Sequence, residues 1–250
     1  MKQGMWQNKK RSKKTLIYVG VIAVLILVAI AVYITFSHVG ENEAVVKVNG
    51  EAVTARELSR HMSWNKAYVI TYFKDEYDAE VDSDFWNRSY GDTTPNEYLR
   101  EYTLKQLVRY KVEQQLAVSY GLMGKEETTY RSFLKKLEEE NNSRSGKAQN
   151  GEIVDGVTQY TESTYFSYVY SNMQLRLQDM LSEKGEPLYV SDEDLKKWYE
   201  QSGNEELDFE EYKGGIRKEY TDEQYSKYID GLVEKAETVK GRKYGKVVIE

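Results

Sequence analysis

An uncharged run of 22 residues near the amino terminus constrains this chain more than any other feature. It extends from Thr15 to Phe36 (TLIYVGVIAVLILVAIAVYITF) and contains neither a charge nor a proline. At a rise of about 1.5 Å per residue, a helix of this length measures about 33 Å, which is enough to cross the hydrocarbon core of a bilayer. We therefore expect residues 15–36 to form a transmembrane helix.

The charges in front of this run predict its orientation. Residues 1–14 contain six basic side chains and no acidic one. Because basic segments resist translocation, residues 1–14 should form a cytoplasmic tail, and the chain after the run should be extracytoplasmic. A cleaved signal peptide is the alternative, but its apolar stretch usually has about 7–15 residues and ends at a small-x-small site. The nearest such site, Thr35-Phe36-Ser37, fits poorly, so we expect an uncleaved, single-pass signal anchor in the cell membrane.

The chain after residue 14 is acidic. The whole sequence has 35 Lys and Arg against 41 Asp and Glu, and without the six basic residues of the tail 29 remain against 41, a net charge of −12. Nucleic acid is not expected as a partner, because phosphate binding requires clustered Lys and Arg. The sequence has no cysteine, which excludes disulfides and a lipid-modified cysteine anchor.

Local signals predict a hairpin and two long helices after the apolar run. Alternating apolar residues flank Asn49-Gly50, a turn signal typical of a β-hairpin over residues 44–53. A capping box formed by Thr54 and Glu57 should begin a helix that ends near residue 78. Thr94-Pro95 should begin a second helix, which Gly121 should terminate.

The second half of the sequence predicts further helices and a terminal strand. Gly214-Gly215 indicates a turn or a helix break there. The predicted elements are a charged helix over 126–140, a polar loop over 141–151, helices over 161–184, from Ser191 to Gln201 and from a cap at Thr221, and a strand over 244–249.

Four segments resemble, in order, the elements of one family. VVKVNGEAVTARELSRH (Val45–His61) is similar to the opening of the SurA-like N-terminal domain of SurA, PrsA and their relatives. Phe85–Leu122 resembles the second long helix of that module. Val190–Glu200 resembles the helix that leads into a parvulin domain in the foldases, and Tyr225–Val239 resembles their closing helix. The resemblance implies a mostly α domain over residues 43–250, with a small β-sheet that joins its two ends.

Two departures from the foldases bear on activity. Fewer than thirty residues separate Gln201 from Tyr225, where the foldases carry the parvulin domain. Parvulin sites also use paired histidines, whereas this chain has only His38 and His61. The resemblance therefore implies a chaperone module and argues against prolyl isomerase activity.

The sequence offers no residue set for catalysis, a metal or a cofactor. His38 and His61 are separated, and with no cysteine a zinc site is not expected. The acidic segment 75–84 fails the EF-hand spacing, because Asn87 stands where the motif has glycine and Thr93 where it has glutamate. We expect no catalytic residue, no metal and no cofactor.

Aromatic residues are the candidates for binding. Tyrosine combines a flat apolar body with a polar tip, which suits weak binding of varied unfolded segments. The alternative is that these rings pack the core between helices. The candidate polypeptide-binding residues are Trp64, Tyr68, Tyr72, Phe73, Phe85, Trp86, Tyr98 and Tyr102.

One functional hypothesis and two alternatives follow. The main hypothesis is a membrane-anchored extracytoplasmic chaperone that binds unfolded or exported polypeptides without covalent chemistry, with a homo-oligomer left open. The first alternative is an interaction or scaffold protein with one dedicated envelope partner. The second is a divergent prolyl isomerase. Suppression of the aggregation of several unrelated proteins would favour the chaperone, and a single stoichiometric partner would favour the interaction or scaffold protein.

Overall fold

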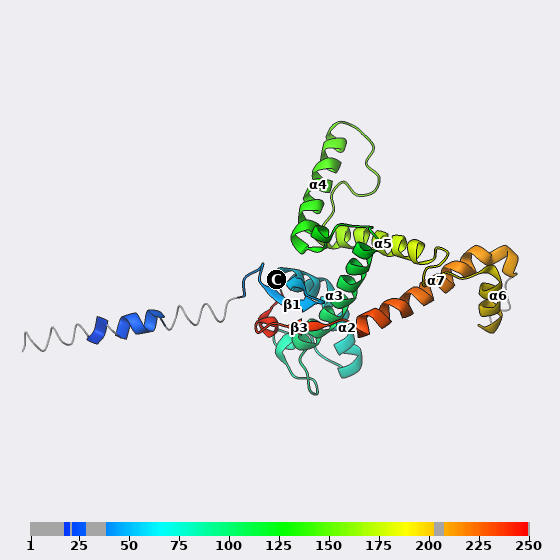
Figure 1. The fold of residues 1–250 in the computed structure, drawn as a ribbon. Coiled ribbons are helices and arrows are strands. Elements are labelled where there is room, and N and C mark those ends of the chain that lie inside the picture. Colours follow the sequence, from blue (N-terminus) through cyan, green and yellow to red (C-terminus); the bar gives the residue numbers. More distant parts are fainter. Residues whose placement is uncertain (1–17, 21, 29–38, 203–207, 250) are drawn as a thin grey trace, which may run out of the picture. The chain divides into compact units, whose positions relative to one another are not determined.

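The computed structural model divides the chain into two compact units, Met1–Glu43 and Ala44–Glu250 (Figure 1). The second unit is mostly helical and contains one small sheet. The residues that the structure describes are 18–20, 22–28, 39–202 and 208–249.

The first unit includes the whole apolar run, of which the structure describes a part. Residues 18–20 and 22–28 are helical and their side chains are exposed. No helix in the described part of the chain is long and apolar enough to cross a membrane. The predicted tail 1–14 and more than half of the predicted transmembrane segment 15–36 lie outside the described residues.

The sheet of the second unit has three antiparallel strands in the order β2–β1–β3. Strands β1 (Ala44–Val48) and β2 (Glu51–Thr54) form the predicted hairpin. Asn49 and Gly50 have φ angles of 50° and 85°, the left-handed conformation that a tight hairpin turn requires. Strand β3 (Thr238–Lys240) pairs with β1, so both ends of the unit contribute to one sheet, as predicted.

The residues of the last strand were predicted wrongly, because the strand is Thr238–Lys240 and not 244–249. Residues 244–249 form no strand; Tyr244–Lys246 is the 3₁₀ helix η3. The segment instead packs against α3: the Tyr244 hydroxyl donates to the Arg100 carbonyl at 3.2 Å, and the Arg100 guanidinium donates to the Val247 carbonyl at 3.1 Å. Tyr244 and Val247 are buried, so side-chain anchoring replaces strand pairing here.

Helix α2 (Ala55–Tyr77) begins where the sequence predicted. The Thr54 hydroxyl accepts from the Glu57 amide at 3.2 Å, and the helix ends at Asp78 in the left-handed conformation. The predicted reciprocal bond from Glu57 is absent, because its carboxylate turns inward and pairs with Lys111 at 2.9 Å. Both side chains are almost fully buried, so this ion pair joins α2 to α3 inside the core.

Helix α3 (Pro95–Ser119) has the full capping box between Thr94 and Glu97. Gly121 has a φ of 69° and ends the helix as predicted. The segment between α2 and α3 contains the short 3₁₀ helix η1 (Phe85–Asn87). Helices α2 and α3 pack side by side and form the base of the unit.

Helix α4 (Tyr130–Gln149) is longer than predicted. It follows the 3₁₀ helix η2 (Lys125–Thr128) and begins with Thr129 as its cap. The predicted helix over 126–140 and the predicted loop over 141–151 are therefore both wrong in their limits, since α4 continues almost to Gly151.

Polar contacts with the returning chain explain this extension. The Asn141 side chain accepts from the Tyr160 amide at 2.7 Å. Arg144 donates to the carbonyls of Asp155 and Val157, both at 2.8 Å, and lies over the Tyr160 ring at 4.5 Å. The polar residues that favoured a loop thus bind the segment after the helix.

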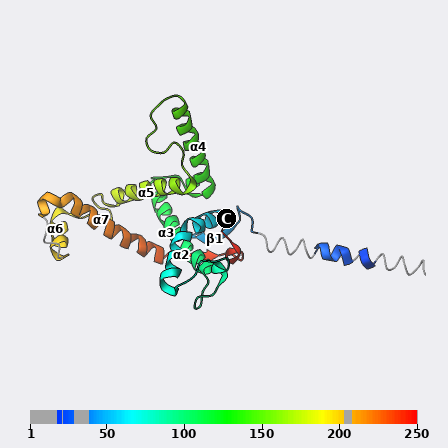
Figure 2. The same ribbon diagram turned by 180° about the vertical axis from the view of Figure 1, so that it is seen from behind.

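Helices α5 (Glu162–Leu181) and α6 (Asp192–Gln201) begin at the predicted caps. The Thr161 and Ser191 hydroxyl groups accept hydrogen bonds from the first-turn amides of Thr164 and Asp194, respectively. Figure 2 shows α4 and α5 diverging from their junction, and α6 beside the amino-terminal end of α7.

Helix α7 (Phe209–Glu234) corrects two predictions. It begins at the Asp208 cap, so Thr221 lies inside the helix instead of starting it. Gly214-Gly215 is also helical and makes no break. Ile216, next to this pair, is buried among residues of α6, which shows that tertiary packing outweighs the low helix propensity of glycine.

Helices α3, α5 and α7 share one apolar cluster. Its buried members are Ala117 of α3, Leu177 and Leu181 of α5, Leu188, and Tyr225 and Ile229 of α7. The buried Glu113 carboxylate joins the same helices, because it accepts hydrogen bonds from Tyr170, Gln174 and Tyr225. The closing helix therefore packs on α3 and α5.

Candidate functional site

Four of the predicted tyrosines form a stacked group on α2 and α3, here called the tyrosine ladder. Tyr68 and Tyr72 lie one turn apart on α2, and Tyr98 and Tyr102 lie one turn apart on α3. The Tyr68 ring stacks on Tyr102 with centroids 4.4 Å apart, and Tyr72 stacks on Tyr98 at 4.5 Å. Tyr68 is 49% exposed, and the other three rings are half-buried.

Two hydroxyl groups of the tyrosine ladder have pKa values above the usual value for tyrosine. Burial, together with the neighbouring Tyr68 and Tyr72, raises the pKa of Tyr98 to about 12. Burial and Tyr68 also raise the pKa of Tyr102 above its usual value. Tyr98 and Tyr102 are therefore uncharged at neutral pH and combine apolar rings with protonated hydroxyl groups.

Trp64 lies beside the ladder, in a hollow of about 250 Å³ between α2, α3 and α5, here called the aromatic hollow. Tyr102 belongs to both features and connects them. Phe166 supplies the facing wall, with its ring centroid 5.4 Å from that of Trp64. Asn65, Gln106, Ser163 and Ser167 place amide and hydroxyl groups around the rings.

The aromatic hollow is uncharged along its described lining. His61 contacts Trp64 with centroids 4.3 Å apart, and burial together with the Lys111 charge lowers the pKa of His61 to about 3. Burial raises the pKa values of Tyr110 and Tyr170 well above their usual range. These three side chains and that of Tyr102, whose pKa is also raised, are neutral at physiological pH, and the remaining lining residues carry no ionisable group.

Three of the predicted residues lie elsewhere. Phe73 and Phe85 are fully buried and pack against each other at 6.1 Å, so they belong to the core and not to a surface. Trp86 is half-buried beside Phe85, at 5.1 Å, and does not line the aromatic hollow. The sequence pattern could not separate these rings from the ladder, because the burial of each ring depends on tertiary packing. Phe73 directly follows Tyr72 on α2, and Phe85 and Trp86 lie in η1 between α2 and α3.

Sequence reasoning missed the polar residues of the aromatic hollow. Asn65 directly follows Trp64 on α2, and Gln106 lies four residues after Tyr102 on α3. Ser163 and Ser167 lie on either side of Phe166 in the sequence of α5. The crowding of aromatic residues at the start of α5 was the available signal. Which face of α5 meets α2 and α3 depends on packing that no local pattern encodes.

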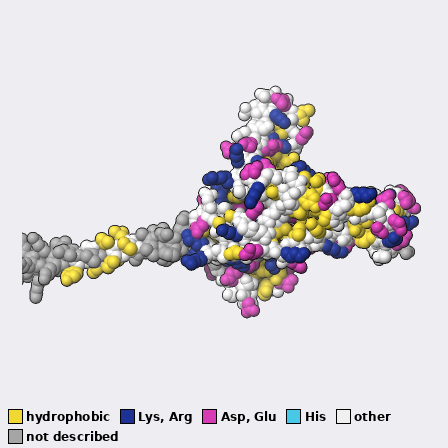
Figure 3. Space-filling view, in the orientation of Figure 1, with side chains coloured by type: hydrophobic (Ala, Val, Ile, Leu, Met, Phe, Trp, Pro, Cys, Tyr) yellow, Lys and Arg dark blue, Asp and Glu magenta, His cyan; other side chains and the backbone are white. Residues whose placement is uncertain are grey.

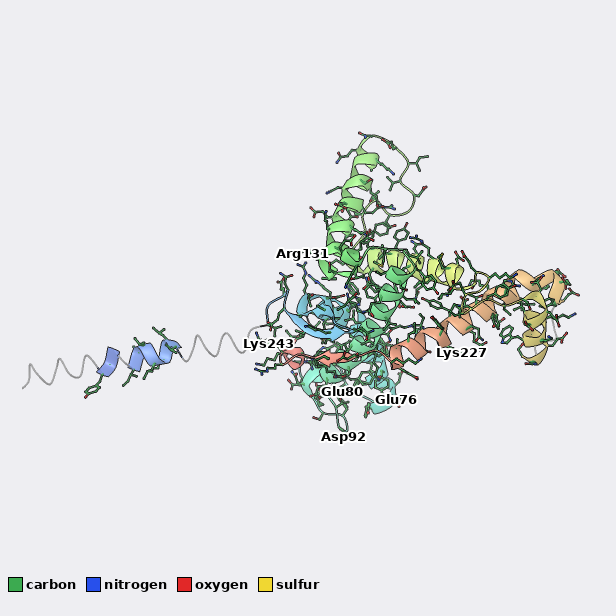
Figure 4. All side chains as sticks on the ribbon, in the orientation of Figure 1. Glu76, Glu80, Asp92, Arg131, Lys227 and Lys243 are labelled. Carbon is green, nitrogen blue, oxygen red and sulfur yellow. The ribbon has the colours of Figure 1, made fainter. Side chains whose placement is uncertain are left out.

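The acidic segment shows internal pairing. Asp82 accepts from Arg88 at 2.5 Å, and this hydrogen bond holds the pKa of Asp82 below its usual value. Figure 4 shows Glu76, Glu80 and Asp92 at the outer edge of this region. Within the described residues, no group of three or more His, Cys, Asp or Glu side chains could hold a metal ion.

Comparison with known proteins yields two matches. The profile of the SurA-like N-terminal domain matches residues 4–138, which include α2, α3 and the first part of α4. A chaperone for lacto-N-biosidase from Bifidobacterium longum subsp. longum is 22% identical over 171 residues, which cover 65% of this chain and 59% of that protein. The chain thus spans less than two thirds of the length of this relative. No solved structure matches significantly.

Proposed function

Because the chain belongs to the family of SurA-like N-terminal domains, we propose that it is a chaperone-like protein that holds unfolded polypeptides. The similarity to a curated chaperone supports the same class of function. We place this activity outside the cytoplasm, on a domain anchored by residues 15–36, on the strength of the apolar run and of the basic residues in front of it. The activity involves binding without covalent chemistry.

The aromatic hollow and the tyrosine ladder are the observation that carries this proposal. Their rings offer apolar contact, and the amide and hydroxyl groups of Gln106, Ser163 and Ser167 suit the hydrogen-bonding groups of an extended main chain. An uncharged lining favours no particular charge in the bound segment.

The size of the hollow favours a polypeptide over a small molecule. Pockets for drug-sized ligands and cofactors usually measure about 300–1,000 Å³. The aromatic hollow, at about 250 Å³, is smaller and opens onto the ladder, so it suits one or two side chains of a longer ligand.

A dedicated client is the second candidate. The curated relative is named as a chaperone for one enzyme, lacto-N-biosidase. By analogy, this chain could serve a single exported protein instead of many. Binding to several unrelated denatured proteins supports the general chaperone, whereas binding to one protein from its own cell envelope supports the dedicated one.

The test measures light scattering from several denatured proteins mixed with the full chain, without nucleotide or metal. We expect aggregation to slow at near-stoichiometric ratios. Gln106→Glu places a charge in the aromatic hollow and should weaken the effect, whereas Gln201→Glu, the same change at an exposed position on α6, should not. Equal effects of both variants would refute the proposed site, and no suppression with any protein would refute the general chaperone.

A further inference from the structure

A second hollow lies on the other side of the α3–α5 contact, here called the basic hollow. It measures about 240 Å³ and lies between α3, α4 and α5. Met123, Phe133, Val169 and Met173 supply its apolar lining, and Figure 3 shows hydrophobic side chains gathered around the carboxyl-terminal half of α5. Methionine adapts its shape to different apolar groups, which suits a site for varied side chains.

The charges of the basic hollow differ from those of the aromatic hollow. Lys136 and Glu127 form an ion pair with each other and neutralise one another. Arg176 also lines the hollow, is exposed, and makes no ion pair or hydrogen bond within the described part of the chain. The lining therefore has one uncompensated positive charge, in a domain whose sequence is strongly acidic.

We propose that the basic hollow binds an apolar side chain of a polypeptide together with one neighbouring acidic side chain, whose carboxylate pairs with Arg176. This inference rests on the proposed function, since it takes the ligand to be an unfolded polypeptide. The volume fits one large apolar side chain, and the guanidinium of Arg176 presents a fork of donors that matches a carboxylate.

An unfolded polypeptide offers many internal carboxylates but only one carboxyl terminus, which favours an internal acidic residue as the ligand. Tyr110 and Tyr170 line both hollows and form a common wall that separates them. The basic hollow therefore binds its apolar and acidic side chains independently of the aromatic hollow. The net charge of −12 beyond the tail disfavours segments with several acidic residues, so a single carboxylate among apolar residues is the preferred ligand.

The test uses the full chain and fluorescent peptides of one apolar sequence, acetylated and amidated, with Glu, Gln or Lys at one central position. By fluorescence anisotropy at low ionic strength, the Glu peptide should bind roughly two- to five-fold more tightly than the Gln peptide. Arg176→Gln should abolish this preference, and Arg176→Glu should transfer it to the Lys peptide. Arg131→Glu makes the same charge change at the exposed start of α4, outside the hollow, and should keep the preference for Glu (Figure 4).

The outcomes separate this inference from the proposed function. Equal binding of the three peptides to the unmodified chain would overturn the basic hollow and leave polypeptide binding intact. A preference for Glu that survives Arg176→Gln would also overturn it. Tighter binding of a Gln peptide with a free carboxyl terminus than of the amidated Glu peptide would identify a chain terminus as the ligand and refute the internal residue. Failure of every peptide to bind would refute both proposals.

Discussion

Replacement of Lys111 by methionine tests how the walls of the aromatic hollow are held. The Lys111 ammonium lies 2.9 Å from the Glu57 carboxylate and donates to the Thr128 carbonyl at 2.9 Å. The lysine and glutamate side chains are 1% and 2% exposed, so Lys111→Met leaves a carboxylate without its cation in the core. Removal of one partner from such a pair costs about 3–5 kcal/mol.

Urea denaturation followed by circular dichroism measures this loss. With an m value of about 2–3 kcal/mol/M, the midpoint should fall by roughly 1–2.5 M. Lys105→Met, an exposed position on the same helix, should change it little. The double variant Glu57→Gln, Lys111→Met should be more stable than Lys111→Met alone, because it removes the stranded charge. A midpoint for Lys111→Met within about 0.5 M of the unmodified chain, or a double variant as unstable as the single one, would refute this reasoning.

Three further predictions concern the core and the carboxyl-terminal segment. Glu113→Ala removes the shared acceptor that joins α3, α5 and α7 and should lower the free energy of unfolding by about 2–4 kcal/mol, as measured in urea. The pKa of His61, lowered by burial from 6.5 to about 3, means that the unfolded chain binds a proton that the folded chain does not. Stability from this group is full above pH 6.5 and falls by about 1.4 kcal/mol per pH unit down to pH 3, so His61→Phe should reduce the slope of stability against pH by one proton in that window. Truncation after Lys240 removes the anchors that Tyr244 and Val247 make on Arg100 and should lower the melting temperature by several degrees; an unchanged temperature would contradict these contacts.

Signals confined to a few neighbouring residues predicted much of the fold. The Asn49-Gly50 turn and the caps at Thr54, Thr94 and Ser191 depend on the chemistry of adjacent residues, and the structure confirms each of them. The order of elements also carried the resemblance to the family whose profile matches residues 4–138.

Contacts between distant residues explain the failures. Gly214-Gly215 weakens a helix by about 2 kcal/mol in total relative to alanine. Arg217 nevertheless fixes α7 here, because it donates to the Val190 carbonyl at 2.9 Å and pairs with Asp192 at 2.5 Å. The last strand was misplaced for a similar reason, since Arg100 takes up the Val247 carbonyl.

The candidate site was predictable in composition but not in geometry. The sequence identified the aromatic residues of α2 and α3, and four of them form the tyrosine ladder. It did not distinguish the buried Phe73 and Phe85 from exposed Tyr68, because the burial of each ring depends on tertiary packing and not on the local pattern. Both hollows depend on where α5 crosses α3, and that crossing is set by side chains far apart in the sequence.

Site-specific photocrosslinking tests the central claim most directly. A benzophenone side chain in place of Gln106 reports on the aromatic hollow, and the same side chain in place of Gln201 serves as the matched control on α6. Each full-length variant is mixed with a denatured protein, irradiated and analysed by mass spectrometry. We predict that position 106 crosslinks to the denatured protein, that position 201 does not, and that the folded form of the same protein crosslinks at neither. Crosslinks of equal yield at both positions, or none at position 106, would contradict polypeptide binding in the aromatic hollow.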